Sequence, residues 1–202
     1  MTKREKYTEF RKNYKFEMPE LKIIDDCIYF NDELVEDLEQ KYPEGETYLD
    51  VGYKLKNSKS KVLSNLFPMQ FTFKGKKVNS IEGIMQGIKY QDIKTQNLVL
   101  KYSGMDAYHI RACNENDFWG ETGILYWQGK PIDRHSEEYQ IFIDEIFISA
   151  LSNPLYERAL LSSDKYILHH IGRDDPKETV LTRYEYELRL NSLRAFVSQN
   201  NK

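Results

Sequence analysis

The chain has 202 residues, 40% of them hydrophobic, so it can bury one sizeable core and is expected to form one domain, at most two. Its formal net charge of -3 argues against a general nucleic-acid binder, because nonspecific binding to phosphates needs many Lys and Arg residues on one face. No apolar run approaches the roughly 18 residues that a membrane span needs. The start MTKREK lacks the apolar core of a signal peptide, and Cys27 and Cys113 show no paired spacing, so we expect a cytoplasmic protein without a membrane partner.

The first 30 residues alternate charged and aromatic side chains without a clear period, and we interpret 1–30 as an N-terminal extension of a domain that spans 31–202. Within this extension, 7–16 fits a short helix and 27–30 a short strand. Asn31 can cap a helix over 32–41, which would end at the YPEG sequence of 42–45. Residues 47–56 are expected to be extended.

The middle of the chain predicts a short hairpin with a Gly turn at 71–77 (FTFKGKK), a helix over 80–90 and another over 96–102. Residues 104–129 are irregular in composition and rich in Asn, Asp and Gly. Phe118, Trp119, Tyr126 and Trp127 lie within this stretch. Trp119 and Trp127 could stack on a flat ligand from exposed loops, or lie partly buried in the core as Trp more commonly does.

The clearest helix covers 136–151, where apolar residues repeat at spacings of three and four and Glu137 and Glu138 occupy the first turn. Asn153 and Pro154 end it and start a short helix that reaches residue 161. Thr182 with Glu185 forms a capping box for the last helix. The predicted fold class is therefore α+β, a mainly α-helical single domain with a few short strands.

A polar triplet stands out in the helix predicted over 80–90 (SIEGIMQGIKY). Offsets of four and then three place Glu82, Gln86 and Lys89 on one face at about 3.6 residues per turn, with the isoleucines on the other side. Ser80 is expected to be the N-cap, and the helix dipole favours a carboxylate two positions later, so the triplet could also be an ordinary solvated face.

Residues 51–81 hold seven lysines and no Asp or Glu, namely Lys54, Lys56, Lys59, Lys61, Lys74, Lys76 and Lys77. This lysine island is either a solvated loop and hairpin edge or a surface for an anionic substrate such as a diphosphate or a DNA backbone. Other chemistries lack their motifs, because there is no Gly-rich phosphate loop, no metal-like spacing and no nucleophile elbow. Neighbouring strand residues point to opposite faces, so we interpret His169 and His170 as structural, and we expect neither a metal nor a cofactor.

Two separated blocks carry a resemblance to a known family. The first comprises 61–68 (KVLSNLFP), the hairpin at 71–77 and the helix at 80–90, and the second comprises 125–140 (LYWQGKPIDRHSEEYQ) and 172–182 (GRDDPKETVLT). In this order they resemble the NADAR family, in its longer branch, from about residue 31 to residue 194. The resemblance implies a YbiA-like fold and a hydrolase of N-glycosidic bonds.

The resemblance also implies which residues form the site. The positions that match are Ser64, Asn65 and Phe67 in a substrate loop, Glu82 and Lys89 as a catalytic pair, Gln86 as a supporting contact, and Asp133, Arg134 and Asp175 as charged residues of the pocket. The chain departs from the YbiA branch at Gly83, where that branch has His. It departs again at Pro176 and Lys177, where that branch has a turn that contains Trp.

Two substrate classes are implied by the family. One is ADP-ribose attached to guanine in DNA, which DarT-type toxins place and NADAR antitoxins remove, and the other is a ribosylamine phosphate of the riboflavin pathway, the YbiA-type activity. The long-branch pattern and the lysine island favour the first, in an antitoxin or in a phage enzyme that counters host defence. A non-catalytic module that binds ADP-ribose or NAD is the alternative of another class.

Breaking the bond between C1 of a ribose and a base nitrogen requires stabilised positive charge at C1, a proton for the leaving base and a nucleophile. If burial leaves the Lys89 amine neutral, it can attack C1 of the ring-opened ribose and form an imine that water hydrolyses. If Lys89 stays charged, it holds phosphate or polarises the ribose. Glu82 at a helix N-terminus is expected to be ionised and to accept a proton. The family resemblance implies the imine route.

Overall fold

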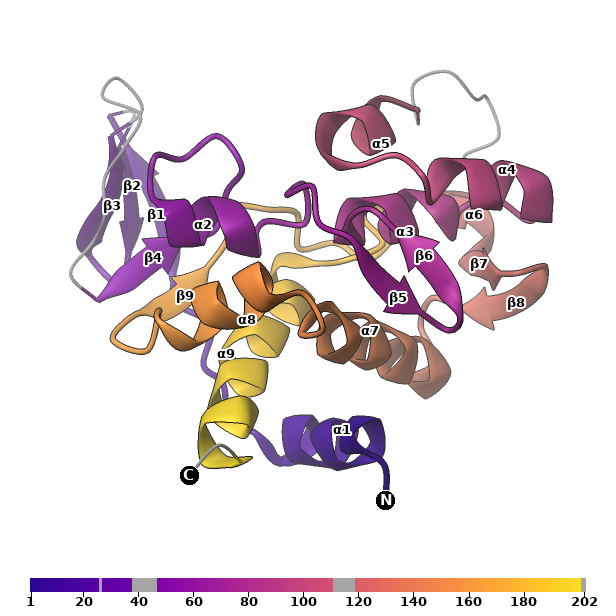
Figure 1. Cartoon of the computed structure of the whole chain (residues 1–202). Helices are drawn as coiled ribbons and strands as arrows, with labels where there is room; N and C mark the ends of the chain where they lie inside the picture. Colours follow the sequence, from indigo (N-terminus) through magenta and orange to yellow (C-terminus); the bar gives the residue numbers. More distant parts are fainter. Residues whose placement is uncertain (26, 38–46, 111–118, 201–202) are drawn as a thin grey trace.

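The computed structural model describes residues 1–25, 27–37, 47–110 and 119–200. It confirms the predicted α+β fold, in which helices and several short strands surround one main hydrophobic core (Figure 1). None of the helices in these ranges is long and apolar enough to cross a membrane.

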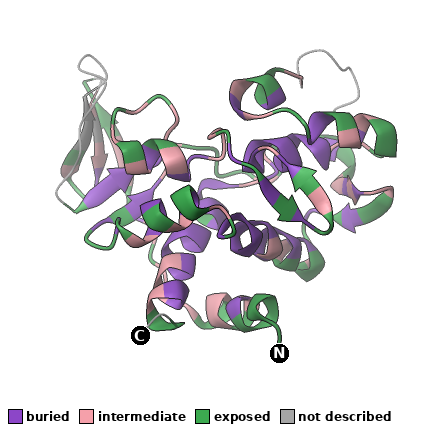
Figure 2. Cartoon of the chain, in the orientation of Figure 1, coloured by how far each residue is buried: buried purple, intermediate pink, exposed green. Residues whose placement is uncertain are grey.

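Two helices form the centre of the core. The helix α7 (Glu137–Ala150) buries its apolar stripe, and α9 (Arg183–Asn200) packs against it, with buried residues gathered in both (Figure 2). Pro154 stands at the start of α8 (Pro154–Leu161), as its sequence predicts. The capping box predicted for α9 is confirmed, because Glu185 N–H donates to Thr182 Oγ1 at 3.2 Å and Thr182 N–H donates to Glu185 Oε2 at 2.8 Å.

The N-terminal residues also contribute to this packing. The helix α1 (Lys3–Asn13) begins four residues earlier than predicted because Thr2 and Glu5 form a capping box. Its Tyr7 is fully buried, and the hydroxyl lies 3.1 Å from Ser192 Oγ of α9. Burial raises the pKa of Tyr7 well above its usual value, and Arg11 pairs with Asp144 of α7 at 2.9 Å. The domain boundary at residue 30 stays a prediction.

The helix predicted over 32–41 is wrong in its described part, where β3 (Glu33–Asp37) pairs antiparallel with β2 (Cys27–Phe30), itself paired with β1 (Leu21–Ile24). Asn31 and Asp32 have φ values of 47° and 66°, and they form the two-residue turn between Phe30 and Glu33. Asn and Asp tolerate this left-handed conformation, so Asn31 starts a hairpin turn here and caps no helix. Residues 38–41 and the stop signal at 42–45 lie outside the described residues.

The remaining strands form three two-stranded sheets. β4 (Tyr48–Asp50) pairs parallel with β9 (Ile167–His169), and the predicted hairpin is confirmed as β5 (Phe71–Phe73) with β6 (Lys76–Val78). β7 (Ile124–Trp127) pairs with β8 (Lys130–Asp133). The helix α2 (Ser58–Leu63) follows β4, and α4 (Ile93–Val99) begins earlier than predicted because Asp92 caps it.

The described part of 104–129 is more regular than its composition indicates. It contains α5 (Gly104–Ile110), α6 (Trp119–Thr122) and β7, whereas Cys113 and Phe118 lie outside the described residues. Trp119 and Trp127 are only 6% and 9% exposed, so the buried alternative holds for both. The Trp127 ring packs at 4.9 Å from that of Phe73 and 5.6 Å from that of Phe142. Burying the large apolar faces of these rings gains more free energy than is lost when the single indole N–H leaves water, so both rings lie in the core.

Candidate functional site

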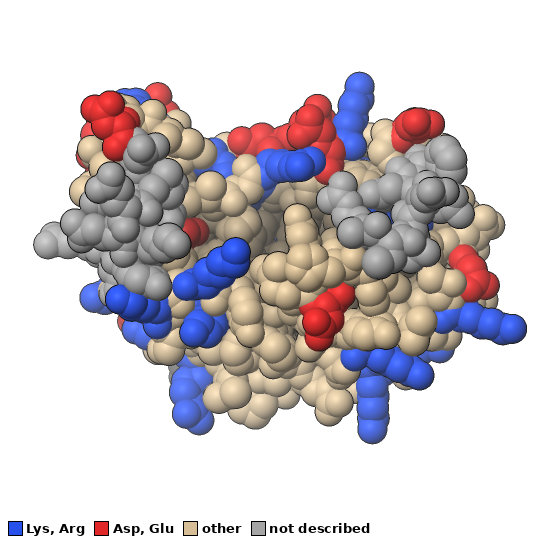
Figure 3. Space-filling model, turned by 90° about the horizontal axis from the view of Figure 1, so that it is seen from above, with Lys and Arg blue, Asp and Glu red and all other residues tan. Residues whose placement is uncertain are grey.

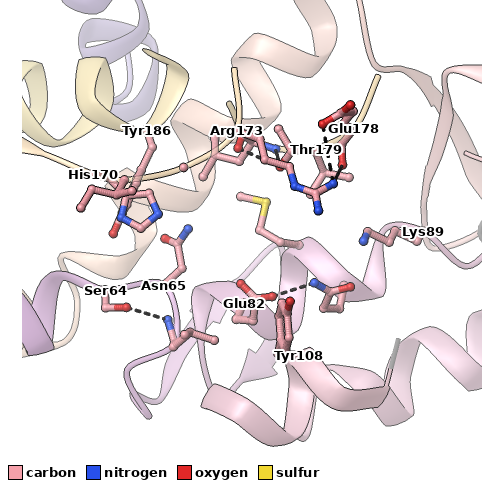
Figure 4. A pocket seen from close by; sticks show the side chains of 17 residues that line it. Ser64, Asn65, Glu82, Lys89, Tyr108, His170, Arg173, Glu178, Thr179 and Tyr186 are labelled. Atoms are coloured by element: carbon pink, nitrogen blue, oxygen red, sulfur yellow. Dashed lines mark hydrogen bonds and ion pairs between the residues drawn. The ribbon is translucent and has the colours of Figure 1, made fainter. Parts of the chain in front are cut away.

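A pocket of about 340 Å³ opens between segments that are far apart in the sequence. One wall is the helix α3 (Ile81–Gly87) with the loop that follows α2, the opposite wall is the segment 170–181 between β9 and α9, and α5 adds Tyr108 at the mouth (Figure 4). We call it the α3 pocket. The upper face of the molecule is hollowed in its middle, with charged side chains along the rim (Figure 3).

The α3 helix carries the predicted polar triplet into this pocket. Ser80 is its N-cap, as predicted, and accepts a hydrogen bond from Gly83 N–H at 2.9 Å. Glu82 and Gln86 are 9% and 5% exposed, and Gln86 Nε2 donates to Glu82 Oε1 at 2.6 Å. Lys89 lies in the turn after α3 and still lines the pocket. The structure therefore brings all three side chains to one cavity, and those of Glu82 and Gln86 on α3 are almost completely buried.

The loop after α2 is tied to the start of α3. Asn65 C=O accepts from Glu82 N–H at 2.9 Å, and Ser64 Oγ accepts from Leu66 N–H at 3.3 Å. Two amide oxygens of the pocket, Asn65 Oδ1 and Gln86 Oε1, are buried and have no hydrogen-bond partner among the described residues. A buried acceptor without a partner loses its bond to water, so these two oxygens favour a ligand that donates N–H or O–H groups.

Gly83 follows Glu82 at a point where α3 touches the end of α4. A Cβ on this residue would lie 3.0 Å from Tyr102 O and 3.3 Å from Ser80 Oγ. Real Cβ atoms essentially never come closer than that, and a backbone carbonyl cannot swing aside. The His that the YbiA branch carries at this position would therefore require the Tyr102 carbonyl to move by a few tenths of an ångström.

We expect Gly83→Ala to destabilise the protein by up to about 2 kcal/mol, because overpacking against the Tyr102 carbonyl costs about 1–3 kcal/mol and the higher helix propensity of Ala recovers only about 1 kcal/mol of it. Urea denaturation of the variant gives the value. Gly87→Ala in the same helix is the control, since its Cβ would meet the movable side chains of Leu100 and Gln96 at 3.3 Å and 3.6 Å. Equal stability of Gly83→Ala and Gly87→Ala would contradict this interpretation.

Lys89 is held at its end of the α3 pocket by an aromatic contact. Its Nζ lies 5.4 Å from the centroid of the Trp119 ring in α6. The face of an indole attracts an ammonium group, so Trp119 holds the Lys89 side chain at this end of the pocket. Trp119 thus serves the pocket through Lys89, although it does not line the pocket itself.

Arg134 supports the opposite wall from behind. It is 2% exposed, and its Nη1 and Nη2 donate to the Glu185 carboxylate at 2.9 Å and 2.7 Å. Its Nε and Nη2 both donate to Thr179 O at 3.3 Å, and Thr179 lines the pocket. Burial alone would raise the pKa of Glu185, but the hydrogen bonds and charge of Arg134 outweigh it and hold that pKa below its usual value. The pair therefore anchors the segment 170–181.

Of the predicted site residues, those that line the α3 pocket are Ser64, Asn65, Glu82, Gln86 and Lys89, and those that do not are Phe67, Trp119, Trp127, Asp133, Arg134 and Asp175. Phe67 packs against the core. Asp133 and Asp175 are exposed, and each accepts a backbone N–H two residues onward at 2.8 Å. Short turns of this kind satisfy the carboxylate locally, so the expectation that both carboxylates line the pocket is wrong for these residues.

The lysine island does not reach the pocket either. None of its seven lysines lines the cavity; Lys59 lies over the Tyr166 ring at 5.9 Å, and Lys74 forms an ion pair with Glu145. The basic side chains that do line it are those of Lys89, Arg173 and His170. Arg173 is paired loosely with Glu178 at 3.8 Å, and both side chains are more than half exposed, so the Arg173 guanidinium remains accessible to an anion.

Sequence reasoning missed Arg173 and His170 as pocket residues. Arg173 lies in the segment 172–182, where the family resemblance directed attention to Asp175. The interpretation of the two histidines as structural residues fits His169. This residue is fully buried against Phe30, and burial lowers its pKa to about 3. His170 instead lines the pocket, and burial lowers its pKa as well. The signal was the change of face between neighbouring residues at the end of a strand, which sends one imidazole inward and the other toward the cavity.

Comparisons with known proteins agree with this architecture. The structure is similar to the NMR structure of the E. coli protein YbiA, with a TM-score of 0.51, 13% identity, and coverage of 77% of this chain and 88% of that chain. At this identity the similarity shows the fold, and it confirms the predicted YbiA-like fold.

The sequence is similar to phage proteins. A 17.1 kDa protein in the Gp30-rIII intergenic region of Enterobacteria phage T4 is 29% identical over 138 residues, which are 65% of this chain and 88% of that protein. The family model described as bacteriophage protein GP30.3 matches residues 57–195. This match covers more than half of the chain and includes every predicted site residue, so the chain belongs to the bacteriophage protein GP30.3 family.

Proposed function

We propose that this protein is an N-glycosidase that removes ADP-ribose from guanine bases in DNA. The observation that carries the proposal is the set of a nearly dry carboxylate, an amide and an amine, Glu82, Gln86 and Lys89, in one pocket of a YbiA-like fold. Its volume of about 340 Å³ falls within the roughly 300–1,000 Å³ of small-molecule sites.

The charges of the pocket suit an anionic sugar derivative. The Arg173 guanidinium lies at the same end as Lys89, where it can bind a diphosphate, and Glu82 lies between this end and the Asn65 end (Figure 4). In a partly desolvated site a carboxylate stabilises the positive charge that develops at C1 of the ribose. Glu82, aligned by the Gln86 amide, is therefore the group we assign to the reacting carbon.

The reaction we propose begins when Glu82 accepts a proton from the Lys89 ammonium and passes it to the ring oxygen of the ribose, so that the ring opens and the protonated base nitrogen forms a double bond to C1. The neutral Lys89 amine adds to C1 and passes a proton to the base nitrogen, and the bond from C1 to the base breaks, which leaves a lysine imine. Water then adds to the imine, C1 is released as an aldehyde, and the ribose ring closes. Glu82, which is ionised again after ring opening, accepts a proton from the attacking water and returns it to the Lys89 nitrogen as C1 leaves.

The phage relatives favour a role on the phage side, in which the enzyme clears ADP-ribose that a host defence attaches to viral DNA, over a role as a bacterial antitoxin. The enzyme would then work in the cytoplasm of the infected host. A YbiA-type substrate, the ribosylamine phosphate, is the alternative within the same class. The departures of this chain from the YbiA branch at Gly83, Pro176 and Lys177 argue against it.

The test is release of ADP-ribose from a guanine-modified DNA oligonucleotide by the wild type, by Glu82→Gln and by Asp175→Asn. Glu82→Gln removes the charge and keeps the shape, so we expect a loss of about 10²-fold or more. Asp175→Asn is the matched control, because Asp175 is exposed and, although it lies within the segment 170–181, its side chain does not line the pocket. It should keep the wild-type rate.

If the wild type releases no ADP-ribose, ADP-ribosylated DNA is not the substrate. Turnover of the pyrimidine ribosylamine phosphate in the same assay would then identify the YbiA-type activity. Tight binding of ADP-ribose without turnover of either substrate would identify a binding module.

A further inference from the structure

One pocket residue has no part in the proposed chemistry. His170 follows β9 and lines the α3 pocket at the end opposite Lys89, next to Asn65, with Glu82 between the two ends (Figure 4). The ring stands edge to face on Tyr186, with centroids 5.1 Å apart and an interplanar angle of 81°. Both its backbone and its ring are therefore held by neighbours of the pocket wall.

The hydrogen bonds of His170 fix its tautomer. Nδ1 lies 2.8 Å from Val51 O, and a carbonyl oxygen can only accept, so Nδ1 must carry the proton. The backbone N–H of His170 donates to Glu187 Oε1 at 2.9 Å, which fixes the residue from the other side. In the neutral ring, Nε2 then carries a lone pair, and no group within the described ranges donates to it. Burial lowers the pKa of His170, so the ring stays neutral at pH 7.

The backbone beside the ring leaves this nitrogen accessible. A Cβ on Gly172 would lie 3.0 Å from His170 Cδ2 and 3.4 Å from Nε2, so any other residue there would press on this edge of the ring. Asn65 Oδ1 at the same end of the pocket is a buried acceptor without a partner among the described residues. This end of the α3 pocket thus presents neutral acceptors, in contrast to the cationic end at Lys89 and Arg173.

We propose that His170 is a specificity-determining residue whose Nε2 accepts a hydrogen bond from a neutral donor group of the ligand, a sugar hydroxyl or a base amino group. The proposal rests on the proposed function for the choice of ligand. A charged phosphate offers no such donor at neutral pH, so the His170 end selects the uncharged part of the N-glycoside. The site rejects an analogue without the donor because the bound analogue would cover Nε2 and leave it unpaired.

The test combines a protein variant with ligand analogues. His170→Asn places an amide N–H near the position of Nδ1, which can still donate to Val51 O, and removes Nε2. The ligands are ADP-ribose with its analogues that lack one ribose hydroxyl each, and guanosine monophosphate with inosine monophosphate, which lacks the amino group. Calorimetry gives each dissociation constant for both proteins.

We expect one analogue to bind the wild type about 3–12-fold more weakly than its parent, as one neutral hydrogen bond allows, and the same analogue to bind His170→Asn as well as the parent does. The analogue that shows this identifies the hydroxyl or the amino group. Gly172→Ala should weaken the binding of the same ligand, because the added Cβ displaces the His170 ring. If His170 is purely structural, His170→Asn will change the stability of the protein, but the affinity difference between analogue and parent ligand will be the same in both proteins.

The proposal is overturned if no analogue loses affinity for the wild type, or if the loss persists unchanged in His170→Asn. The binding cycle needs no turnover. If the protein binds ADP-ribose but releases none from DNA, the proposed hydrolase activity is disproved. The affinities of the analogues still test the proposed role of His170.

Discussion

Lys89→Arg should release ADP-ribose from modified DNA about 10³-fold more slowly than the wild type, or slower still, while its affinity for ADP-ribose stays within a few fold. The guanidinium keeps the positive charge and can stack on Trp119, but it stays protonated and cannot attack C1. Loss of a covalent nucleophile typically removes most of the rate, which sets this magnitude. Single-turnover release and calorimetry measure the two quantities separately.

Borohydride provides the complementary readout for Lys89. Added during turnover, it should reduce the imine and leave ADP-ribose attached to the wild type, detectable by mass, and no adduct should form on Lys89→Arg. A Lys89→Arg enzyme that keeps more than a tenth of the wild-type rate would show that Lys89 acts only through its charge. In that case water attacks C1 directly, and Glu82 becomes the base that activates it.

Arg134→Met should destabilise the fold by about 3–5 kcal/mol, the typical effect of removing one partner of a buried ion pair. The Glu185 carboxylate would stay buried without its guanidinium, and the Thr179 carbonyl would lose both donors. Urea denaturation at pH 7 gives the change in the free energy of unfolding. Because Thr179 lines the pocket, the variant should also bind ADP-ribose more weakly at temperatures where it is folded.

The pH dependence provides the control for Arg134. Arg134 lowers the pKa of Glu185 in the folded protein, so the stability from this pair is present above the unfolded value of about 4.5 and is lost as the pH falls through the folded value. The penalty of Arg134→Met should therefore shrink below pH 4.5, and Arg134→Met with Glu185→Gln should recover part of the stability at pH 7. A penalty that is constant with pH would mean that Arg134 acts through packing on Tyr139, whose ring lies 4.7 Å away.

Local patterns in the sequence determined the elements whose contacts are local. The apolar spacing of α7, the Ser80 cap of α3 and the capping box of α9 each depend on residues three or four apart, and each appears in the structure. The same periodicity placed Glu82 and Gln86 on one face, and Lys89 follows within a single turn. These features do not need the rest of the chain to be decided.

Tertiary structure alone decided the other half of the α3 pocket. Its second wall, 170–181, meets α3 from about 90 residues away, and Arg134 holds that wall through Glu185. Whether a polar residue such as Asp175 faces a cavity or forms a hydrogen bond within its own turn depends on which distant segment packs beside it. The spacing of residues in the local sequence does not determine this. The burial of Trp119 has the same origin, since core packing joins distant segments, and at Asn31 the pairing of β2 with β3 outweighs the local propensity for a helix cap.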